Sequence, residues 1–339
     1  MRYIFLIFIS IMALFSCEQD KDQVTQGIYV WSERRSYEYL DTAELKFVHR
    51  HQVKKIYCKL TDVVWDEASH ATPEDIRDLP YDPTLNTFVS VVPCIFFTNE
   101  VMLKSSPEEL RYIAEKIAMR LGNEKVNYKE IQIDCDWSAQ SKEHYFFFLK
   151  TLQSLLRGTK ISVTLRLYQY RYPDKAGVPP AARAMLMLYN FKSPQVLSQG
   201  NTIFDKAEAL KYLSDKKYPL PLDFALPSFS WNLLYDAHGM FLGFIKNTNL
   251  HEDHNLFSPI HDHQFVCLAD TVVEGLYLRK GNILKKEYIS MKELEQARAL
   301  VTAFKNTDMY TLALFDLSTQ TQTLINADTD EKIFFKNTP

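Results

Sequence analysis

The chain has 339 residues, of which 46% are hydrophobic and 13% aromatic, so it can bury a large core and does not have the composition of a disordered protein. Its formal net charge is -3. Binding to nucleic acid requires a clustered basic surface that neutralises phosphates, and neither the charge balance nor the sequence provides one. We therefore expect no nucleic-acid partner.

The first residues predict an export signal. Arg2 precedes an almost wholly apolar run from Tyr3 to Phe15, which is too short to cross a bilayer and is typical of a signal peptide. The next residues complete the phrase Leu14-Phe15-Ser16-Cys17, which resembles a bacterial lipoprotein box. That resemblance implies that Cys17 is lipidated and anchors the chain to the bilayer of the cell envelope, at the outer membrane on its periplasmic or surface side. The alternative is an ordinary signal peptide with an incidental cysteine.

After this signal the chain divides into a short tether and one large domain. Residues 1–17 form the signal and residues 18–26 an acidic tether, which leaves 27–339 for the domain. Apolar runs with a period of two predict eight strands in that domain, over residues 27–31, 55–60, 87–98, 130–137, 160–168, 184–190, 222–229 and 310–317. Helices are predicted between most of them, over 37–52, 106–121, 142–156, 205–214 and 290–305.

Strands that alternate with helices imply a mainly parallel sheet. Eight such units in a chain of this length favour a closed (β/α)8 barrel of the TIM type, with an open doubly wound sheet as the alternative. No glycine-rich phosphate loop of the GxGxxG or GxxxxGK[ST] kind follows any predicted strand. The sequence therefore disfavours dinucleotide and nucleoside-triphosphate enzymes, and we expect no cofactor.

A segment over about 230–270, between strands seven and eight, interrupts this rhythm and is predicted to be an insertion or lid. It contains His251-Glu252-Asp253-His254 and His261-Asp262-His263, which supply enough ligands for a zinc ion. One alternative is therefore a metal-dependent hydrolase that uses these histidines. Their spacing does not match HExxH, so a solvated segment without a metal site is the preferred interpretation.

Four cysteines lie in apolar, strand-like runs: Cys58, Cys94, Cys135 and Cys267. No CxxC motif is present. Isolated cysteines in such runs behave as small buried hydrophobes, so structural thiols are predicted. A cross-strand disulfide is the alternative in an oxidising compartment.

The fourth predicted strand, over 130–137, is the most informative stretch. Because side chains alternate along a strand, Gln132, Asp134 and Asp136 share one face, and the apolar residues between them share the other. In a barrel the polar face looks inward, with Asp136 nearest the carboxyl-terminal mouth, where barrel enzymes carry out their chemistry. The alternative for Asp134 is an interior ion pair with Lys59 or Arg166.

Polar and aromatic side chains recur at the same ends of the other predicted strands. Acids and amides bind sugar hydroxyls, aromatic rings stack on sugar faces, and paired carboxylates serve as acid and base, so a carbohydrate partner is predicted. The catalytic candidates are Asp136, Asp134 and Arg166. The substrate-binding candidates are Trp31, Lys59, Asn99, Tyr168, Gln169, Tyr189, Asn190, Trp231 and Asp316.

The phrase Ile133-Asp134-Cys135-Asp136-Trp137 resembles the DxDxE signature of chitinase-type glycoside hydrolase barrels. The resemblance implies that Asp134 and Asp136 match the two signature aspartates, but Ser138 stands where the family has its catalytic Glu. An acid from elsewhere would have to complete a hydrolase, with Asp223, Glu274 and Asp316 as candidates.

A wider set of segments resembles an uncharacterised family of barrel-domain bacterial lipoproteins. These are Gln132 to Trp137, Leu165 to Gln169, Gly177-Val178-Pro179-Pro180, Met185 to Asn190 and Tyr218 to Asp223. Two functions remain open. The first is an envelope lipoprotein whose barrel recognises and hydrolyses a carbohydrate, and the second is a lipoprotein that only binds glycans or takes part in assembly.

Overall fold

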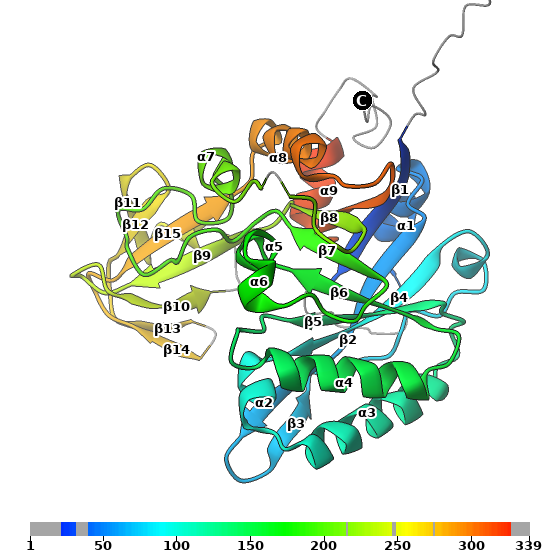
Figure 1. Cartoon of the computed structure of the whole chain (residues 1–339). Coiled ribbons are helices and arrows are strands. Elements are labelled where there is room, and N and C mark those ends of the chain that lie inside the picture. Colours follow the sequence, from blue (N-terminus) through cyan, green and yellow to red (C-terminus); the bar gives the residue numbers. More distant parts are fainter. Residues whose placement is uncertain (1–21, 32–39, 215, 246–248, 274, 327–339) are drawn as a thin grey trace, which may run out of the picture.

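In the computed structural model, eight parallel strands close into a barrel (Figure 1). Strand β1 pairs with both β2 and β16, which closes the sheet, so the predicted TIM-type barrel is confirmed and the open sheet is wrong. The strands, in chain order, are β1 (Gln23–Val30), β2 (Lys55–Asp66), β4 (Ser90–Phe97), β5 (Glu130–Cys135), β6 (Lys160–Leu165), β7 (Arg183–Met187), β8 (Leu222–Pro227) and β16 (Met309–Phe315).

The structure describes residues 22–31, 40–214, 216–245, 249–273 and 275–326. The predicted signal with Cys17, and the candidate acid Glu274, lie outside these ranges. Strand β1 begins at Gln23, so the last residues of the predicted tether are part of the barrel. None of the helices within the described ranges is both long and apolar enough to span a bilayer.

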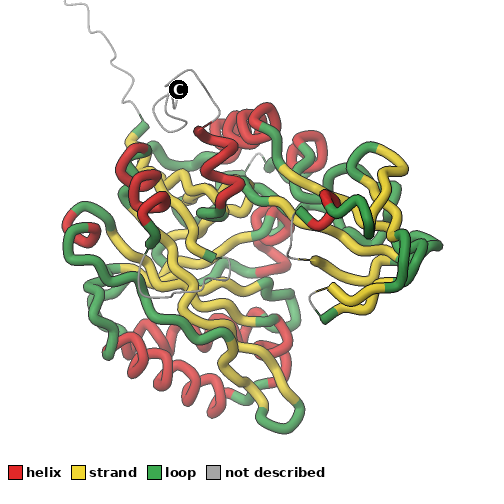
Figure 2. The backbone as a smooth tube through the Cα atoms, turned by 180° about the vertical axis from the view of Figure 1, so that it is seen from behind, coloured by secondary structure: helices red, strands yellow, loops and turns green. Residues whose placement is uncertain are grey.

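Helices cover the outside of the strands (Figure 2). The predicted capping boxes at Ser106 and Ser290 are both present, with each serine hydroxyl accepting from the amide of a glutamate three residues later. The longer helices are α1 (Thr42–Arg50), α3 (Pro107–Gly122), α4 (Lys142–Leu155), α8 (Met291–Phe304) and α9 (Thr319–Asn326). The short ones are α2 (Asn99–Lys104), α5 (Leu167–Arg171), α6 (Pro173–Ala176), α7 (Lys206–Leu210), η1 (Leu85–Thr87) and η2 (Leu250–Glu252).

No regular α-helix separates β2 from β4. Instead, β2 continues into a hairpin with the antiparallel strand β3 (His70–Glu74). An apolar pocket of about 380 Å³ lies on the outside of the barrel between this hairpin and α3. The hairpin thus takes the place of one helix of the outer layer and covers the barrel incompletely.

The segment between β8 and α8 is a folded unit, and it extends to the side of the barrel (Figure 1). The predicted insertion between strands seven and eight is confirmed, but it is longer than the predicted 230–270, because its strands continue to Tyr288 and have their own apolar core. Five strands form an antiparallel sheet in the order β10 (Phe241–Ile245), β9 (Ser230–Tyr235), β15 (Ile283–Tyr288), β12 (Gln264–Cys267), β11 (Phe257–His261). A hairpin of β13 (Thr271–Val273) and β14 (Leu276–Leu278) completes the unit.

A buried ion pair attaches this inserted sheet to the loop after β7. The Nζ atom of Lys285 lies 2.8 Å from Oε1 of Glu287, and both residues are buried. Oε2 of Glu287 accepts hydrogen bonds from the amide and hydroxyl of Thr202 and from the indole of Trp231. The charge of Glu287 is therefore compensated by groups from both the sheet and the loop.

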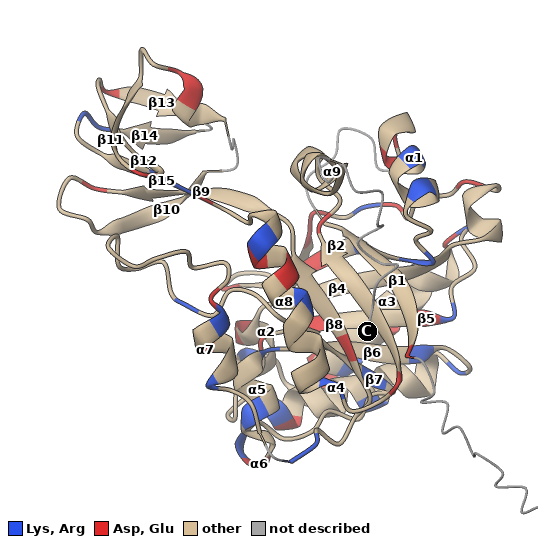
Figure 3. Cartoon of the chain, turned by 90° about the horizontal axis from the view of Figure 1, so that it is seen from above, with Lys and Arg blue, Asp and Glu red and all other residues tan. Residues whose placement is uncertain are grey.

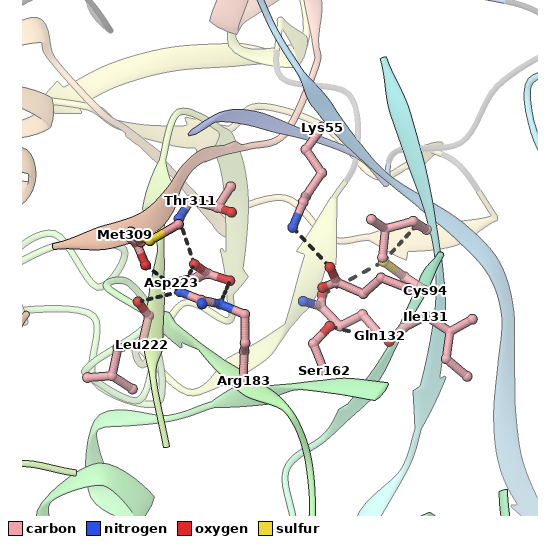
Figure 4. Close-up of polar contacts among 12 residues, drawn as sticks. Lys55, Cys94, Ile131, Gln132, Ser162, Arg183, Leu222, Asp223, Met309 and Thr311 are labelled. Carbon is pink, nitrogen blue, oxygen red and sulfur yellow. Dashed lines mark hydrogen bonds and ion pairs between the residues drawn. The ribbon is translucent and has the colours of Figure 1, made fainter. Parts of the chain in front are cut away.

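The barrel interior is polar and aromatic along much of its length. At its amino-terminal end Arg183 donates two hydrogen bonds to the carboxylate of Asp223, which also accepts from the amide of Thr311 (Figure 4). Lys55 forms an ion pair with Glu130 in the same region. Asp223 lies at the start of β8, far from the mouth, so the suggestion that it completes a hydrolase there is wrong.

Charged residues are spread over the whole molecule. Figure 3 shows Lys and Arg interspersed with Asp and Glu over the helices and the inserted strands.

The four cysteines of the described part, Cys58, Cys94, Cys135 and Cys267, are all buried and free, as the preferred interpretation predicts. Their role is packing, and the alternative of a cross-strand disulfide is not realised among them.

Removal of Glu287 should destabilise the protein strongly. In Glu287→Ala the buried ammonium of Lys285 loses its carboxylate, and breaking such a pair typically costs about 3–5 kcal/mol. The free energy of unfolding in urea, followed by tryptophan fluorescence, measures the loss. The double variant Lys285→Met, Glu287→Leu should lose less, because it leaves no buried charge unpaired.

The control for this experiment is Lys211→Ala. Lys211 pairs with Glu208 at the surface, where its side chain is 68% exposed, so its removal should change stability by less than about 1 kcal/mol. Equal losses in Glu287→Ala and Lys211→Ala would contradict a structural role for the buried pair.

Candidate functional site

The inward face of β5 carries a column of polar groups, as the alternation predicts. At its lower end Gln132 accepts a 2.6 Å hydrogen bond from the hydroxyl of Tyr29, which comes from β1. One step higher, Oδ1 of Asp134 accepts a 2.6 Å hydrogen bond from Thr164 of β6. Asp136 follows the last residue of the strand, so the column rises from the barrel interior to its carboxyl-terminal mouth.

Asp134 is buried and its pKa is raised. Desolvation by burial raises this pKa from 3.8 to about 6, and the charge of Asp136 acts in the same direction. The charge of Arg166 and the hydrogen bond from Thr164 act in the opposite direction but do not outweigh burial. Near neutral pH, Asp134 can therefore hold or release a proton inside the barrel.

Asp136 forms a two-pronged ion pair with Arg166. Nε of the guanidinium lies 2.6 Å from Oδ1, and Nη2 lies 3.1 Å from Oδ2. Burial acts to lower the pKa of Arg166, but the neighbouring carboxylate of Asp136 outweighs it and raises that pKa above its ordinary value. The side chain of Asp136 is 49% exposed, so the pair faces solvent. The alternative of an interior ion pair between Asp134 and Arg166 is therefore not realised, because Arg166 pairs with Asp136 at the rim.

A pocket of about 360 Å³ opens beside this ion pair. It brings together five of the predicted site residues: Asp136, Arg166, Tyr168, Tyr189 and Asn190. Strand β6 ends at Leu165, so Tyr168 lies on α5 rather than at a strand end, and this residue is 49% exposed. Leu167, Phe191 and Tyr212 complete the lining.

Aromatic rings connect this pocket to the rest of the mouth. The ring of Phe315 lies 5.2 Å from those of Tyr29 and Tyr189, and 5.7 Å from those of Trp31 and Phe229. From Phe229 the row continues through Trp231 to Phe244 of the inserted sheet. The predicted aromatic residues Trp31, Tyr189 and Trp231 thus belong to one continuous row.

Three other predicted site residues are held by protein groups and do not line this pocket. Lys59 forms ion pairs with Asp62 and Asp75. Asn99 accepts a 2.5 Å hydrogen bond from Ser141, and Gln169 bridges the amide of Arg166 and the carbonyl of Trp137. The side chains of these three residues are therefore engaged by other protein groups.

The remaining candidates lie deeper or to the side. Asp316 is 6% exposed and follows β16, where its carbonyl accepts from the hydroxyl of Thr321. The indole of Trp231 donates to Glu287 and its ring belongs to the inserted sheet. The hydroxyl of Ser138, at the position of the family's catalytic Glu, lies 3.3 Å from that of Ser141.

The predicted histidine segment does not form a metal centre in the described part of the chain. No group of three or more His, Cys, Asp or Glu residues is placed there to hold an ion. His251 and His263 line a different pocket, with none of the residues of the Asp136 pocket.

Sequence reasoning missed the aromatic residues Phe315, which links the row, and Phe191 and Tyr212, which line the pocket. Phe315 directly precedes the predicted Asp316 at a strand end, so its position was available as a signal. Tyr212 lies beyond α7, and no periodicity indicates that it reaches the mouth.

No family model and no curated protein matches this chain. Among solved structures, the spore cortex-lytic enzyme SleL of Bacillus cereus aligns with 90% of this chain and 74% of its own length, with a TM-score of 0.50 and 12% identity. A fungal endo-β-N-acetylglucosaminidase of glycosyl hydrolase family 18 aligns with 92% of this chain and 97% of its own, with a TM-score of 0.47 and 8% identity.

The closed sheet of eight parallel strands defines the class of fold, which is a TIM-type (β/α)8 barrel. At 12% identity the likeness to SleL extends to the fold alone.

Replacement of Asp134 should change how stability depends on pH. Because the pKa of this carboxyl is higher in the folded than in the unfolded state, its contribution is largest below pH 3.8 and is lost as pH rises through about 6. In Asp134→Asn this loss is absent, so stability relative to wild type should rise by about 2–3 kcal/mol between pH 4 and pH 7. Urea unfolding at a series of pH values measures the difference.

Thr164→Val provides a matched comparison. It removes the hydrogen bond that lowers the pKa of Asp134, so the pH-dependent loss should become larger than in wild type. A difference between Asp134→Asn and wild type that stays constant from pH 4 to pH 7 would contradict a raised pKa.

Proposed function

We propose that this protein is an envelope lipoprotein whose barrel mouth binds a carbohydrate. The observation that carries the proposal is the pocket in which the ion pair of Asp136 and Arg166 lies beside the rings of Tyr168 and Tyr189. Charged and amide groups at its wall offer donors and acceptors for hydroxyls, and aromatic rings offer faces for the apolar side of a sugar.

The exposure of these groups supports binding. Asp136 and Tyr168 are each about half exposed, so a ligand can contact them without breaking the fold. Asn190 adopts a positive φ of 57° at the rim of the pocket, a conformation that asparagine tolerates better than most residues. The row of rings from Phe315 to Phe244 extends the stacking surface beyond one sugar unit.

The same geometry favours binding without hydrolysis. A glycosidase needs an acid beside the scissile bond, and Ser138 replaces the acid that the resemblance to chitinases would supply. Both carboxylate oxygens of Asp136 accept hydrogen bonds from Arg166, which suits a fixed acceptor for sugar hydroxyls.

One observation favours hydrolysis as a second candidate function. Asp134 has a pKa of about 6, so part of its population is protonated near neutral pH, as a general acid requires. Cleavage of any bound glycan that is abolished in Asp134→Asn would support this candidate over binding alone.

Arg166→Met should weaken glycan binding. A glycan array probed with the purified full chain identifies a ligand, and calorimetric titration then gives its dissociation constant. Loss of the guanidinium removes a charged donor and releases Asp136, so we expect binding to weaken at least about tenfold. Arg171→Met, which removes a nearby arginine outside the pocket lining, should bind as wild type does.

Two results would count against this proposal. If the wild-type protein binds no glycan on the array, the proposal that its ligand is a carbohydrate is wrong. If Arg166→Met and wild type bind a glycan equally well, the pocket at Asp136 is not the binding site. Circular dichroism of each variant distinguishes a lost site from a lost fold.

The lipid anchor is proposed from the resemblance of Leu14 to Cys17 to a lipoprotein box. Cys17→Ser should abolish incorporation of labelled palmitate in a bacterial host and move the protein from the membrane to the soluble fraction, because stable attachment depends on buried acyl chains. Cys267→Ser, which changes a buried thiol, is the control and should be labelled normally. Unchanged labelling of Cys17→Ser would contradict the anchor.

A further inference from the structure

A second, larger pocket lies between the inserted sheet and α9. Its volume is about 620 Å³, and it shares no lining residue with the pocket at Asp136. The side chains that matter here are Lys286, His251, His263, Asn249, Thr319 and Gln320. Two of the histidines that were considered as metal ligands in the alternative interpretation, His251 and His263, therefore line the same pocket as Lys286.

Lys286 is the centre of this pocket. Along β15 the neighbours Lys285 and Glu287 point to the face that joins the β7 loop, so Lys286 points to the opposite face. Its Nζ lies 3.3 Å from Nε2 of His251. Among the described residues no carboxylate lies within ion-pair distance of this ammonium, and the ion pair beside it is already closed between Lys285 and Glu287.

The electrostatics of Lys286 follow from this arrangement. Burial lowers its pKa from the ordinary value of a lysine, and the charge of Glu252 opposes that effect without cancelling it. A partly buried cation that lacks an adjacent anion is stabilised by any ligand that brings one.

The other walls supply donors rather than acids. His263 packs edge-on against Tyr288 at 5.1 Å, and its carbonyl accepts the amide of Lys286, so its position is fixed by the sheet. Thr319 and Gln320 form the first turn of α9, where the positive end of the helix dipole favours an anion. Asn249 adds an amide that can bind hydroxyls.

We propose that this pocket binds the carboxylate of an acidic sugar, with Lys286 as its counter-ion and the neutral polar side chains around it binding the hydroxyls. The choice of a sugar rests on the proposed function, whereas the negative charge follows from the pocket itself. Ser230 lines this pocket, whereas the indole of Trp231, the next residue of the strand, donates to Glu287 on the opposite face of the sheet. The pocket is therefore a separate site from the row of rings that leads from the mouth.

Titration with glucuronate, followed by the histidine ring resonances in NMR spectra of the full chain, tests this proposal. We expect wild type and Lys286→Arg to bind glucuronate, and Lys286→Met to bind it at least about tenfold more weakly, because a charged hydrogen bond is lost. Lys292→Met, on α8 outside the pocket, should behave as wild type. Glucose should shift these resonances far less than glucuronate.

Any other result of these titrations contradicts a particular part of the proposal. Equal affinity of wild type and Lys286→Met, or no binding by either, overturns the site. If inorganic sulfate binds as tightly as glucuronate, the pocket is a simple anion site and the proposal that it recognises a sugar is wrong. Loss of glucuronate binding in Arg166→Met instead of Lys286→Met places the acid at the mouth, which overturns this inference but not the proposed function. If glucuronate binds at Lys286 while Arg166→Met has no effect on neutral glycans, the proposed function fails and this site stands.

Discussion

The polar column on β5 determines most of what is distinctive in this barrel. A closed barrel forces alternate side chains inward, and each polar group placed there needs a partner because water is excluded. Tyr29 donates to Oε1 of Gln132 and Thr164 donates to Asp134, whereas Asp136 reaches solvent and pairs with Arg166. The polar groups of this strand therefore make internal hydrogen bonds deep in the barrel and a solvent-accessible ion pair at its mouth.

The two acids at the mouth lie in different environments. Asp134 and Asp136 keep the arrangement of two acids along one strand, and burial separates their environments. Ser138, however, contributes only hydroxyl and amide hydrogen bonds within its own turn. The aromatic row and the ion pair support the proposed recognition of a sugar more than they support bond cleavage.

The inserted sheet uses alternation in the same way as β5. On β15 the inward pair of Lys285 and Glu287 attaches the sheet to the barrel, and the residue between them faces a separate pocket. One strand therefore carries both an attachment and a charged surface, and neither interferes with the other because they lie on opposite faces. On the face of Glu287 the sheet also extends the aromatic row through Trp231 and Phe244.

The sequence by itself determined the barrel, its eight strands, the helices that begin at Ser106 and Ser290, and the inward direction of Asp134 and Asp136. All of these depend on periodicity and capping over a few residues, which the sequence displays directly. Only the tertiary structure decided that Asp223 lies at the far end of the barrel, that Lys59 and Gln169 have protein partners, and that residues 230–288 form a sheet. These outcomes depend on contacts between segments far apart in the chain: Arg183 meets Asp223 across β7 and β8, and Thr202 meets Glu287. The local sequence pattern does not predict such pairings, because they form only when the barrel closes and the inserted sheet packs against it.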